Sequence, residues 1–135
     1  MAKEGVPAEA LRALFEPFPP EAVSWRVGST TKDKTRGLAL AYIDARDVMN
    51  RLDAVCGPGN WSDYYDVDWF PGDQKRMIVT CTLSIRVDGE WVSKSDAAEN
   101  TDIEAVKGSH SDAFKRAAVK WGVGRYLYDT DNLWV

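Results

Sequence analysis

Residues 109–128 read SHSDAFKRAAVKWGVGRYLY, and this stretch determines how the rest of the chain can be arranged. In and just before it, apolar residues recur at intervals of three and four, which places them on one face of an α-helix. They are Val106, His110, Ala113, Phe114, Ala117 and Trp121. At roughly 100° per residue, Lys115, Arg116 and Lys120 lie on the opposite side within an arc of about 140°. The pattern predicts a helix that packs through one face and presents positive charge on the other.

The composition is that of one soluble globular domain spanning residues 1–135, with 44% hydrophobic and 28% charged residues. No apolar run is long enough to cross a bilayer, and the N-terminus has neither a signal-peptide core nor an Arg-rich transit pattern, so we expect a cytoplasmic protein. Cys56 and Cys81 stand in apolar contexts and are too few for a disulfide framework or a zinc site. We therefore expect two packing cysteines and no metal.

The charge is acidic overall but basic locally. A net charge of −4 argues against a protein that binds polyanions over its whole surface. Between residues 103 and 125, however, five cations stand against two carboxylates, which leaves +3. The cations are Lys107, Lys115, Arg116, Lys120 and Arg125, and the carboxylates are Glu104 and Asp112. Such a stripe is sufficient for a phosphate backbone if the acidic residues face elsewhere.

The first part of the chain predicts a helix, a strand and a loop. Residues 7–15 form a short amphipathic pattern, and residues 22–27 and 38–42 have the character of strands. The loop between these strands carries Lys32, Lys34 and Arg36. Two interpretations of the loop stay open at this point: a solvated basic turn or a lip that contacts phosphate.

A second helix is predicted over residues 42–56. Asp44 can cap its amino end and Asp47 favours the positive end of the helix dipole, while Gly57 stops the helix. Arg46 and Arg51 face outward in this pattern. Taken singly, such cations are more typical of ordinary surface than of ligands.

From residue 60 onward the period changes to two, which predicts an antiparallel sheet. A strand over residues 61–70 is followed by a half-buried strand over 76–87, the hairpin signal Asp88-Gly89, and a return strand over 90–98. Thr101 and Glu104 have capping-box spacing, so the last helix should begin near Asp102. The fold class predicted is α+β: a β-β-β-α core in which a meander packs on a long helix, with an additional N-terminal hairpin and helices.

The sequence offers little for catalysis. It has no nucleophile elbow, phosphate-cradling Gly-Lys-Ser/Thr loop or Cys-X-X-Cys pair, and His110 falls on the apolar side of the last helix. One enzymatic alternative is a magnesium-dependent nuclease with four carboxylates as ligands. These are Asp96, Glu99, Asp102 and Glu104. We expect no enzymatic activity and no cofactor.

With these elements in order, the chain resembles the Rad52-type (Rad52/Rad22) single-strand annealing proteins of DNA repair, in particular their short bacterial and phage relatives. The resemblance runs from about residue 18 to residue 128. It rests most on AYIDARDVMNRLDAVCGPGNW (41–61) and SDAFKRAAVKWGVGRYLY (111–128), with PFPPEAVSWRV (17–27) adding weaker support. It implies a ring of many subunits, a basic groove that holds single-stranded DNA by its backbone, and no nucleotide hydrolysis.

The resemblance also implies site residues. The Lys-Arg pair of the family's groove helix falls on Lys115 and Arg116, where the helical pattern independently places charge. A further arginine of the eukaryotic members falls on Val119, beside Lys120. An arginine of their earlier helix falls on Asp47, beside Arg46. Neighbouring cations are therefore inferred to substitute for two expected arginines.

The leading hypothesis is a homo-oligomeric, non-enzymatic protein that binds and anneals single-stranded DNA, with a recombinase or single-strand binding protein as a further partner. The candidate DNA-binding residues are Lys115, Arg116, Lys120, Arg46, Lys32, Lys34, Arg36 and Lys107. Tyr64, Tyr65, Trp69 and Phe70 are candidates for base stacking, although core or subunit-contact roles are more typical. The alternative is a protein-interaction or structural module whose basic helix face contacts an acidic partner or a neighbouring subunit.

Overall fold

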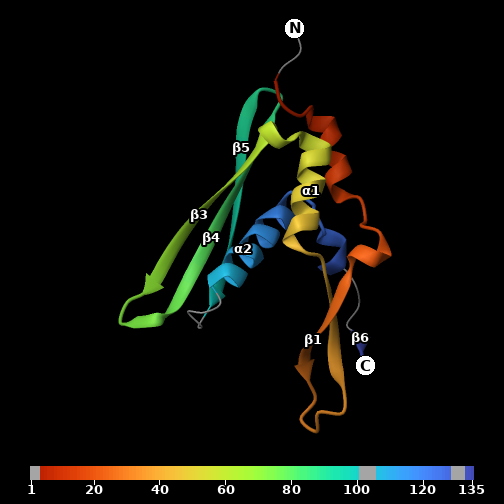
Figure 1. Cartoon of the computed structure of the whole chain (residues 1–135), viewed down its shortest axis with the longest axis vertical. Helices are drawn as coiled ribbons and strands as arrows, with labels where there is room; N and C mark the ends of the chain where they lie inside the picture. The colour runs from red at the N-terminus through yellow and green to blue at the C-terminus, as the bar shows by residue number, and fades with distance from the viewer. Residues whose placement is uncertain (1–3, 101–105, 129–132) are drawn as a thin grey trace.

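The computed structural model describes residues 4–100, 106–128 and 133–135, which form two antiparallel sheets and several helices (Figure 1). The strand orders are β1-β2-β6 and β3-β4-β5. The larger sheet runs along one side of the molecule, helix α2 lies across it, and helix α1 stands beside α2. The smaller sheet projects away from this body as a hairpin. The α+β class predicted from the sequence is confirmed.

The N-terminal segment is helical but not α-helical. η1 (Ala8–Phe15) and η2 (Pro20–Ala22) are 3₁₀-helices. The backbone N–H of Glu16 donates to the carbonyl of Ala13, three residues back, and Pro17 then holds Glu16 in an extended conformation. Eight residues flanked by prolines give little room for the cooperative α-helix, which explains the tighter geometry. Leu14 is fully buried beneath this segment.

The projecting hairpin joins β1 (Ser24–Thr30) to β2 (Gly37–Tyr42). In its register Arg26 is opposite Leu40 and Val27 is opposite Ala39. Strand β6 (Leu133–Trp134) pairs with the other edge of β2. The six residues of β1 from Trp25 onward are all exposed, so β1 is an edge strand with few neighbours.

Helix α1 (Ala45–Cys56) begins and ends close to the predicted residues. Asp44 occupies the N-cap position, but its side chain makes no capping hydrogen bond, so the predicted side-chain cap is wrong. The Asp44 carbonyl instead accepts the backbone N–H groups of Asp47 and Val48. Gly57, with φ of +88°, ends the helix at the predicted position.

The meander consists of β3 (Trp61–Phe70), β4 (Asp73–Val87) and β5 (Glu90–Asn100). Asp88 and Gly89 both have positive φ, as the predicted two-residue turn requires. Alternate residues of β4 face the helices and are almost fully buried. They are Met77, Val79, Cys81, Leu83 and Ile85. The opposite face of the sheet carries cross-strand hydroxyl pairs such as Thr82 with Ser95 at 2.8 Å.

Helix α2 (Val106–Lys120) covers the buried face of the meander and continues through Gly108 without a break. Phe114 and Trp121 are buried as predicted, and the Trp121 indole donates to the carbonyl of Leu83 at 3.0 Å. The predicted start near Asp102 and the capping box from Thr101 lie outside the described residues. The apolar half of the helical pattern therefore fixes α2 to the sheet.

The two cysteines are packing residues, as the sequence predicted. Cys56 and Cys81 are buried and free, and burial raises the pKa of each thiol to about 11.

Within the described ranges, none of the helices has the length and apolar character needed to cross a membrane.

Candidate nucleic-acid interface

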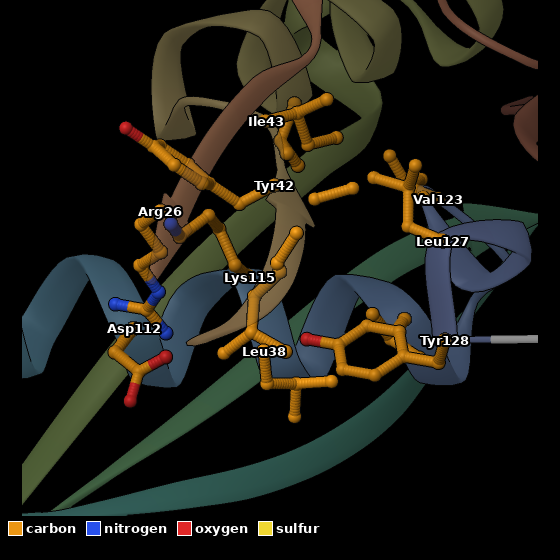
Figure 2. Close-up of a pocket in the computed structure, with 15 residues that line it drawn as sticks. Arg26, Leu38, Tyr42, Ile43, Asp112, Lys115, Val123, Leu127 and Tyr128 are labelled. Carbon is orange, nitrogen blue, oxygen red and sulfur yellow. The ribbon is translucent and has the colours of Figure 1, made fainter. Parts of the chain in front are cut away.

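A groove of about 210 Å³ separates the hairpin from α2 (Figure 2). Strand β2 forms one wall, α2 the other, and 3₁₀-helix η5 (Arg125–Tyr128) lies at one end. Figure 2 shows Arg26, Lys115 and Asp112 together at the opposite end. The groove therefore has a charged end and a largely apolar end.

One aromatic ring organises two cations at the charged end. The Lys115 ammonium lies 5.5 Å from the centroid of the Tyr42 ring, and the Arg26 guanidinium lies 5.8 Å from the same centroid. Arg26 comes from β1, Tyr42 from the end of β2 and Lys115 from α2. Cations are attracted to the negative face of an aromatic ring, so Tyr42 holds both charges at the groove although they repel each other. This arrangement can receive a phosphate.

A carboxylate lies among these cations. Asp112 lines the groove and pairs with Arg116 one turn later on α2, with a nitrogen-to-oxygen distance of 3.3 Å. Both side chains are about half exposed, so the pair contributes little to stability. Arg116 also lines a smaller hollow beside the groove, together with Asp96. Arg116 thus lies near the groove, and its ion pair with Asp112 is weak.

The apolar lining includes the first of the two departures from the family pattern. Val119 lies one turn after Lys115 and lines the groove, so the position expected to carry an arginine does face this site but carries no charge. Leu38, Ile43 and Leu127 continue the apolar lining toward η5.

Lys120, the inferred substitute, is directed elsewhere. Its ammonium donates a short hydrogen bond to the backbone carbonyl of Ser95 on β5. The carbonyl of Lys120 accepts hydrogen bonds from Lys94 at 3.2 Å and from Arg125 at 2.8 Å. These cations neutralise the negative end of the α2 dipole. Lys120 therefore contributes to joining α2 and β5, and it is not among the residues that line the groove.

The remaining predicted cations lie at different distances from the groove. Arg46 is exposed in the first turn of α1, just after the β2 wall, but does not line the groove. Lys32, Lys34 and Arg36 lie at the free end of the hairpin, well away from α2 (Figure 1). The side chain of Lys107 is outside the described part of the structure. The structure thus places Lys115 at the groove and Arg116 at the neighbouring hollow, and of the other candidates whose side chains are described, none lines either hollow.

The hairpin loop is organised by one carboxylate. Asp33 accepts hydrogen bonds from the Thr31 hydroxyl at 2.6 Å, the Thr35 hydroxyl at 2.8 Å and the Thr35 backbone N–H at 3.1 Å. These bonds lower the pKa of Asp33 to about 2, and the bond from the Thr31 hydroxyl has the largest effect. The loop cations therefore extend from a defined turn.

The four aromatic side chains predicted as stacking candidates do not line the groove. The Tyr65 hydroxyl donates to Asp63 at 2.8 Å, and its ring lies 5.0 Å from that of His110. Tyr64 is exposed on the opposite face of the sheet from α2. The centroid of the half-buried Phe70 ring lies 4.0 Å from the Arg76 guanidinium at the far end of β3, and the neighbouring Trp69 is exposed.

The carboxylates of the nuclease alternative are only partly described. Glu99 pairs with Arg76, and Asp96 accepts a hydrogen bond from the Ala97 backbone N–H at 2.7 Å. Asp102 and Glu104 lie in the range 101–105, outside the description. Among the described residues, no three His, Cys, Asp or Glu side chains are grouped to hold a metal ion.

Two residues that line the groove, Arg26 and Tyr42, were not among the site residues predicted from the sequence. The available signal was a single cation in the apolar strand pattern SWRV and a tyrosine at the end of the next strand. Their proximity depends on the hairpin register, and their contact with Lys115 depends on how the hairpin docks on α2. Neither follows from local spacing.

Comparison with known proteins gives a consistent result. Residues 7–135 match the family described as Rad52/22 family double-strand break repair protein. A relative from Deinococcus deserti, named single-stranded DNA-binding protein DdrA, is 43% identical over 130 residues, covering 95% of this chain and 61% of the relative. The DdrA of Deinococcus radiodurans is 37% identical over 129 residues, covering 94% of this chain and 58% of the relative. The chain thus spans about three fifths of the length of these curated relatives.

Proposed function

Because the chain belongs to the Rad52/22 family of double-strand break repair proteins, we propose that it binds single-stranded DNA and anneals it to a complementary strand, without nucleotide hydrolysis. The observation that carries the proposal is the convergence of Arg26 and Lys115 on the ring of Tyr42, with Arg116 on the same helix. The curated relatives bear the name single-stranded DNA-binding protein, which agrees with this ligand.

The chemistry of the groove suits a sugar-phosphate backbone. Arg26 and Lys115 come from elements far apart in sequence and point to one place, where a cationic guanidinium and an ammonium can both attract phosphate. Contacts to phosphate carry no sequence information, so a strand held this way is bound whatever its bases. Bases left facing outward are then available to a second strand. Annealing requires both properties.

The acidic remainder of the chain confines DNA to this region. The whole chain has a net charge of −4, so surfaces remote from the groove repel a polyanion on average. In this proposal the other predicted cations add positive charge outside the groove itself. They are Arg46, Lys107, Lys120 and the loop residues Lys32, Lys34 and Arg36. We expect Lys120 to contribute less than Lys115 because its ammonium already bonds to Ser95.

Assembly into a homo-oligomeric ring is part of the proposal, with residues 1–135 acting as one DNA-binding domain. Trp25 and Val27 on β1 are 58% and 62% exposed, and they lie on the face of the hairpin opposite Arg26. These two neighbouring apolar side chains give another subunit a surface on which to pack. A ring would line up one groove per subunit into a continuous path for the strand.

The test combines Lys115→Ala with Arg116→Ala and measures binding of an unstructured oligothymidine by fluorescence anisotropy over a range of salt concentrations. We expect at least about a tenfold loss of affinity at low salt. The slope of log affinity against log salt should flatten by about 1.4, because two phosphate contacts to a single strand are lost. The mass of the assembly should stay unchanged.

The matched control is Arg12→Ala, which removes an exposed cation from η1, outside the groove. It should leave both affinity and slope close to those of the unaltered protein. Unchanged binding by the double variant would overturn the site. Failure of the unaltered protein to bind the oligonucleotide, or to speed pairing of complementary strands, would overturn the function.

A further inference from the structure

Tyr128 is exposed to an unusual degree for a large side chain. It ends η5 and is 68% exposed, more than any other large hydrophobic side chain in the described ranges. Its neighbours on η5 are engaged: the Tyr126 hydroxyl accepts the backbone N–H of Phe18 at 3.0 Å, and Leu127 packs against the core. Tyr128 is therefore the aromatic residue of this segment that the fold leaves in solvent.

The position of Tyr128 is as informative as its exposure. It lines the groove that contains Arg26 and Lys115, and it also lines the smaller hollow that contains Arg116. Val119 lines both hollows as well. Tyr128 therefore stands on the boundary between them, and a chain of phosphates that runs from one hollow to the other has to pass this ring.

Tyr128 differs from Tyr42, the other groove tyrosine, in what its ring contacts. Tyr42 has Arg26 and Lys115 within 6 Å of its ring, so its role is to hold cations. Within the described ranges, Tyr128 has no ring, cation or hydrogen-bond contact. Figure 2 shows its ring directed along the groove from η5 toward Leu38. Its faces are available to a ligand.

We propose that Tyr128 is a base-stacking residue: while the strand's phosphates lie on Arg26, Lys115 and Arg116, one base per subunit lies against the Tyr128 ring. This inference rests on the proposed function and adds a base contact to a site otherwise built for phosphate. Stacking on an aromatic ring accepts any base, because every base has a π-face, so it remains compatible with binding that ignores sequence. It also gives the strand a fixed spacing relative to each subunit.

Stacking and phosphate binding can be separated by their dependence on salt. Loss of a phosphate contact flattens the salt slope because fewer counterions are released on binding. Loss of a stacking contact lowers affinity and leaves the slope unchanged, because no charge is removed. It also has no consequence on a strand that lacks bases.

The experiment measures binding of two oligonucleotides of equal length and charge, an oligothymidine and a fully abasic strand, by fluorescence anisotropy. Tyr128→Ala should weaken oligothymidine binding about fivefold to tenfold, at the low end of the range for one stacked base. The salt slope should stay the same, and the loss on the abasic strand should be below about twofold. Tyr128→Phe should restore binding and Tyr128→Leu should not, since only phenylalanine keeps the ring.

Tyr64→Ala is the matched control, because Tyr64 is 64% exposed on the far side of the sheet. It should bind both strands as the unaltered protein does. Equal binding by Tyr128→Ala and the unaltered protein, or an equal loss on both strands, overturns the stacking role and leaves the proposed function standing. If the unaltered protein binds neither strand, the proposed function and this inference both fall.

Discussion

The α2–meander body and the β1–β2 hairpin both carry cations predicted to contact DNA, but they hold them in opposite ways. In the body, Lys115 and Arg116 project from a helix whose other face is buried through Phe114 and Trp121. In the hairpin, β1 is exposed along most of its length and the loop cations lie at its free end. The hairpin contacts the body near its root, where the Tyr42 ring of β2 lies 5.5 Å from the Lys115 ammonium.

In the proposed function, the charge of a cation and the way the fold holds it should contribute separately to the affinity for DNA. A cation on a packed helix has already lost most of its freedom, so contact with a phosphate costs little further entropy. A cation at the end of an exposed hairpin has to be ordered when it binds. Equal charges should therefore contribute unequally, and the following changes test that expectation.

The largest expected difference is in stability. Leu83→Ala removes a fully buried side chain from β4 beneath α2 and should lower the free energy of unfolding by about 2–5 kcal/mol. Thr30→Ala, at an exposed site on β1, should change it by about 0.5 kcal/mol or less. Urea unfolding followed by circular dichroism measures both. A large loss for Thr30→Ala would show that the hairpin contributes to stability as the body does.

The next difference is between two single cations of the same hairpin. Arg26→Ala removes the cation held at Tyr42 and should weaken oligothymidine binding about fivefold to tenfold at low salt. Lys34→Ala removes a loop cation and should cost less than about threefold, because ordering the loop offsets part of its attraction to phosphate. Anisotropy titrations compare them directly. An equal loss of affinity in the two variants would show that a cation at the root of the hairpin and a cation in its loop contribute equally to binding.

A smaller effect of opposite sign is expected at Asp112. This carboxylate lines the groove and pairs with Arg116, so it competes with phosphate for the same cations. Asp112→Asn should raise affinity about twofold to threefold at low salt, since an exposed pair of this kind contributes about 0.2–1 kcal/mol. Asp68→Asn, on the exposed part of β3, is the matched control and should have little effect. Weaker binding by Asp112→Asn would indicate that the carboxylate positions Arg116.

The smallest effect is confined to the hairpin loop. Asp33→Ala removes the acceptor of three hydrogen bonds and should speed amide hydrogen exchange in residues 31–36, with no change in α2. The pKa of Asp33 is lowered from 3.8 to about 2, so its ionised form orders the loop fully above pH 4. That order should fade as the pH falls from about 4 through about 2. If neither Asp33→Ala nor the lower pH speeds amide hydrogen exchange in residues 31–36, the turn does not depend on Asp33.

The sequence was sufficient for the elements whose pattern is local. The alternation in β4, the turn at Asp88 and the apolar stripe of α2 each specify an element through neighbours only a few residues apart, and each was predicted correctly. The 3₁₀ form of η1 was missed because the spacing of its apolar residues does not distinguish a short α-helix from a tighter one. The missing side-chain cap at Asp44 depends on a rotamer that residue type alone does not set.

The candidate site was predictable only on the α2 side. Lys115 and Arg116 follow from the helical arc and from the family resemblance. Arg26 and Tyr42 reach Lys115 only through the docking of the hairpin on α2, which is a long-range arrangement with no local signature. The same reason explains Lys120: its position on the helix is as predicted, but β5 offers a carbonyl that the sequence could not place beside it.

The N-terminal segment has a consequence for the order in which the groove forms. The Phe15 ring lies beneath Gly122, where an added Cβ would approach it to 2.6 Å, and the Arg125 guanidinium lies 5.0 Å above the same ring. The Phe18 N–H bonds to the Tyr126 hydroxyl, across 108 positions of sequence. The corner between α2 and η5 therefore rests on residues more than 100 positions earlier in the sequence.

Contacts between such distant parts of a chain tend to form late in folding, because a long loop must close first. During translation, the N-terminal segment has to wait in contact with α1 until the end of α2 has left the ribosome. The groove is then completed in one closing step, so a nascent chain should form the complete groove only after η5 has left the ribosome.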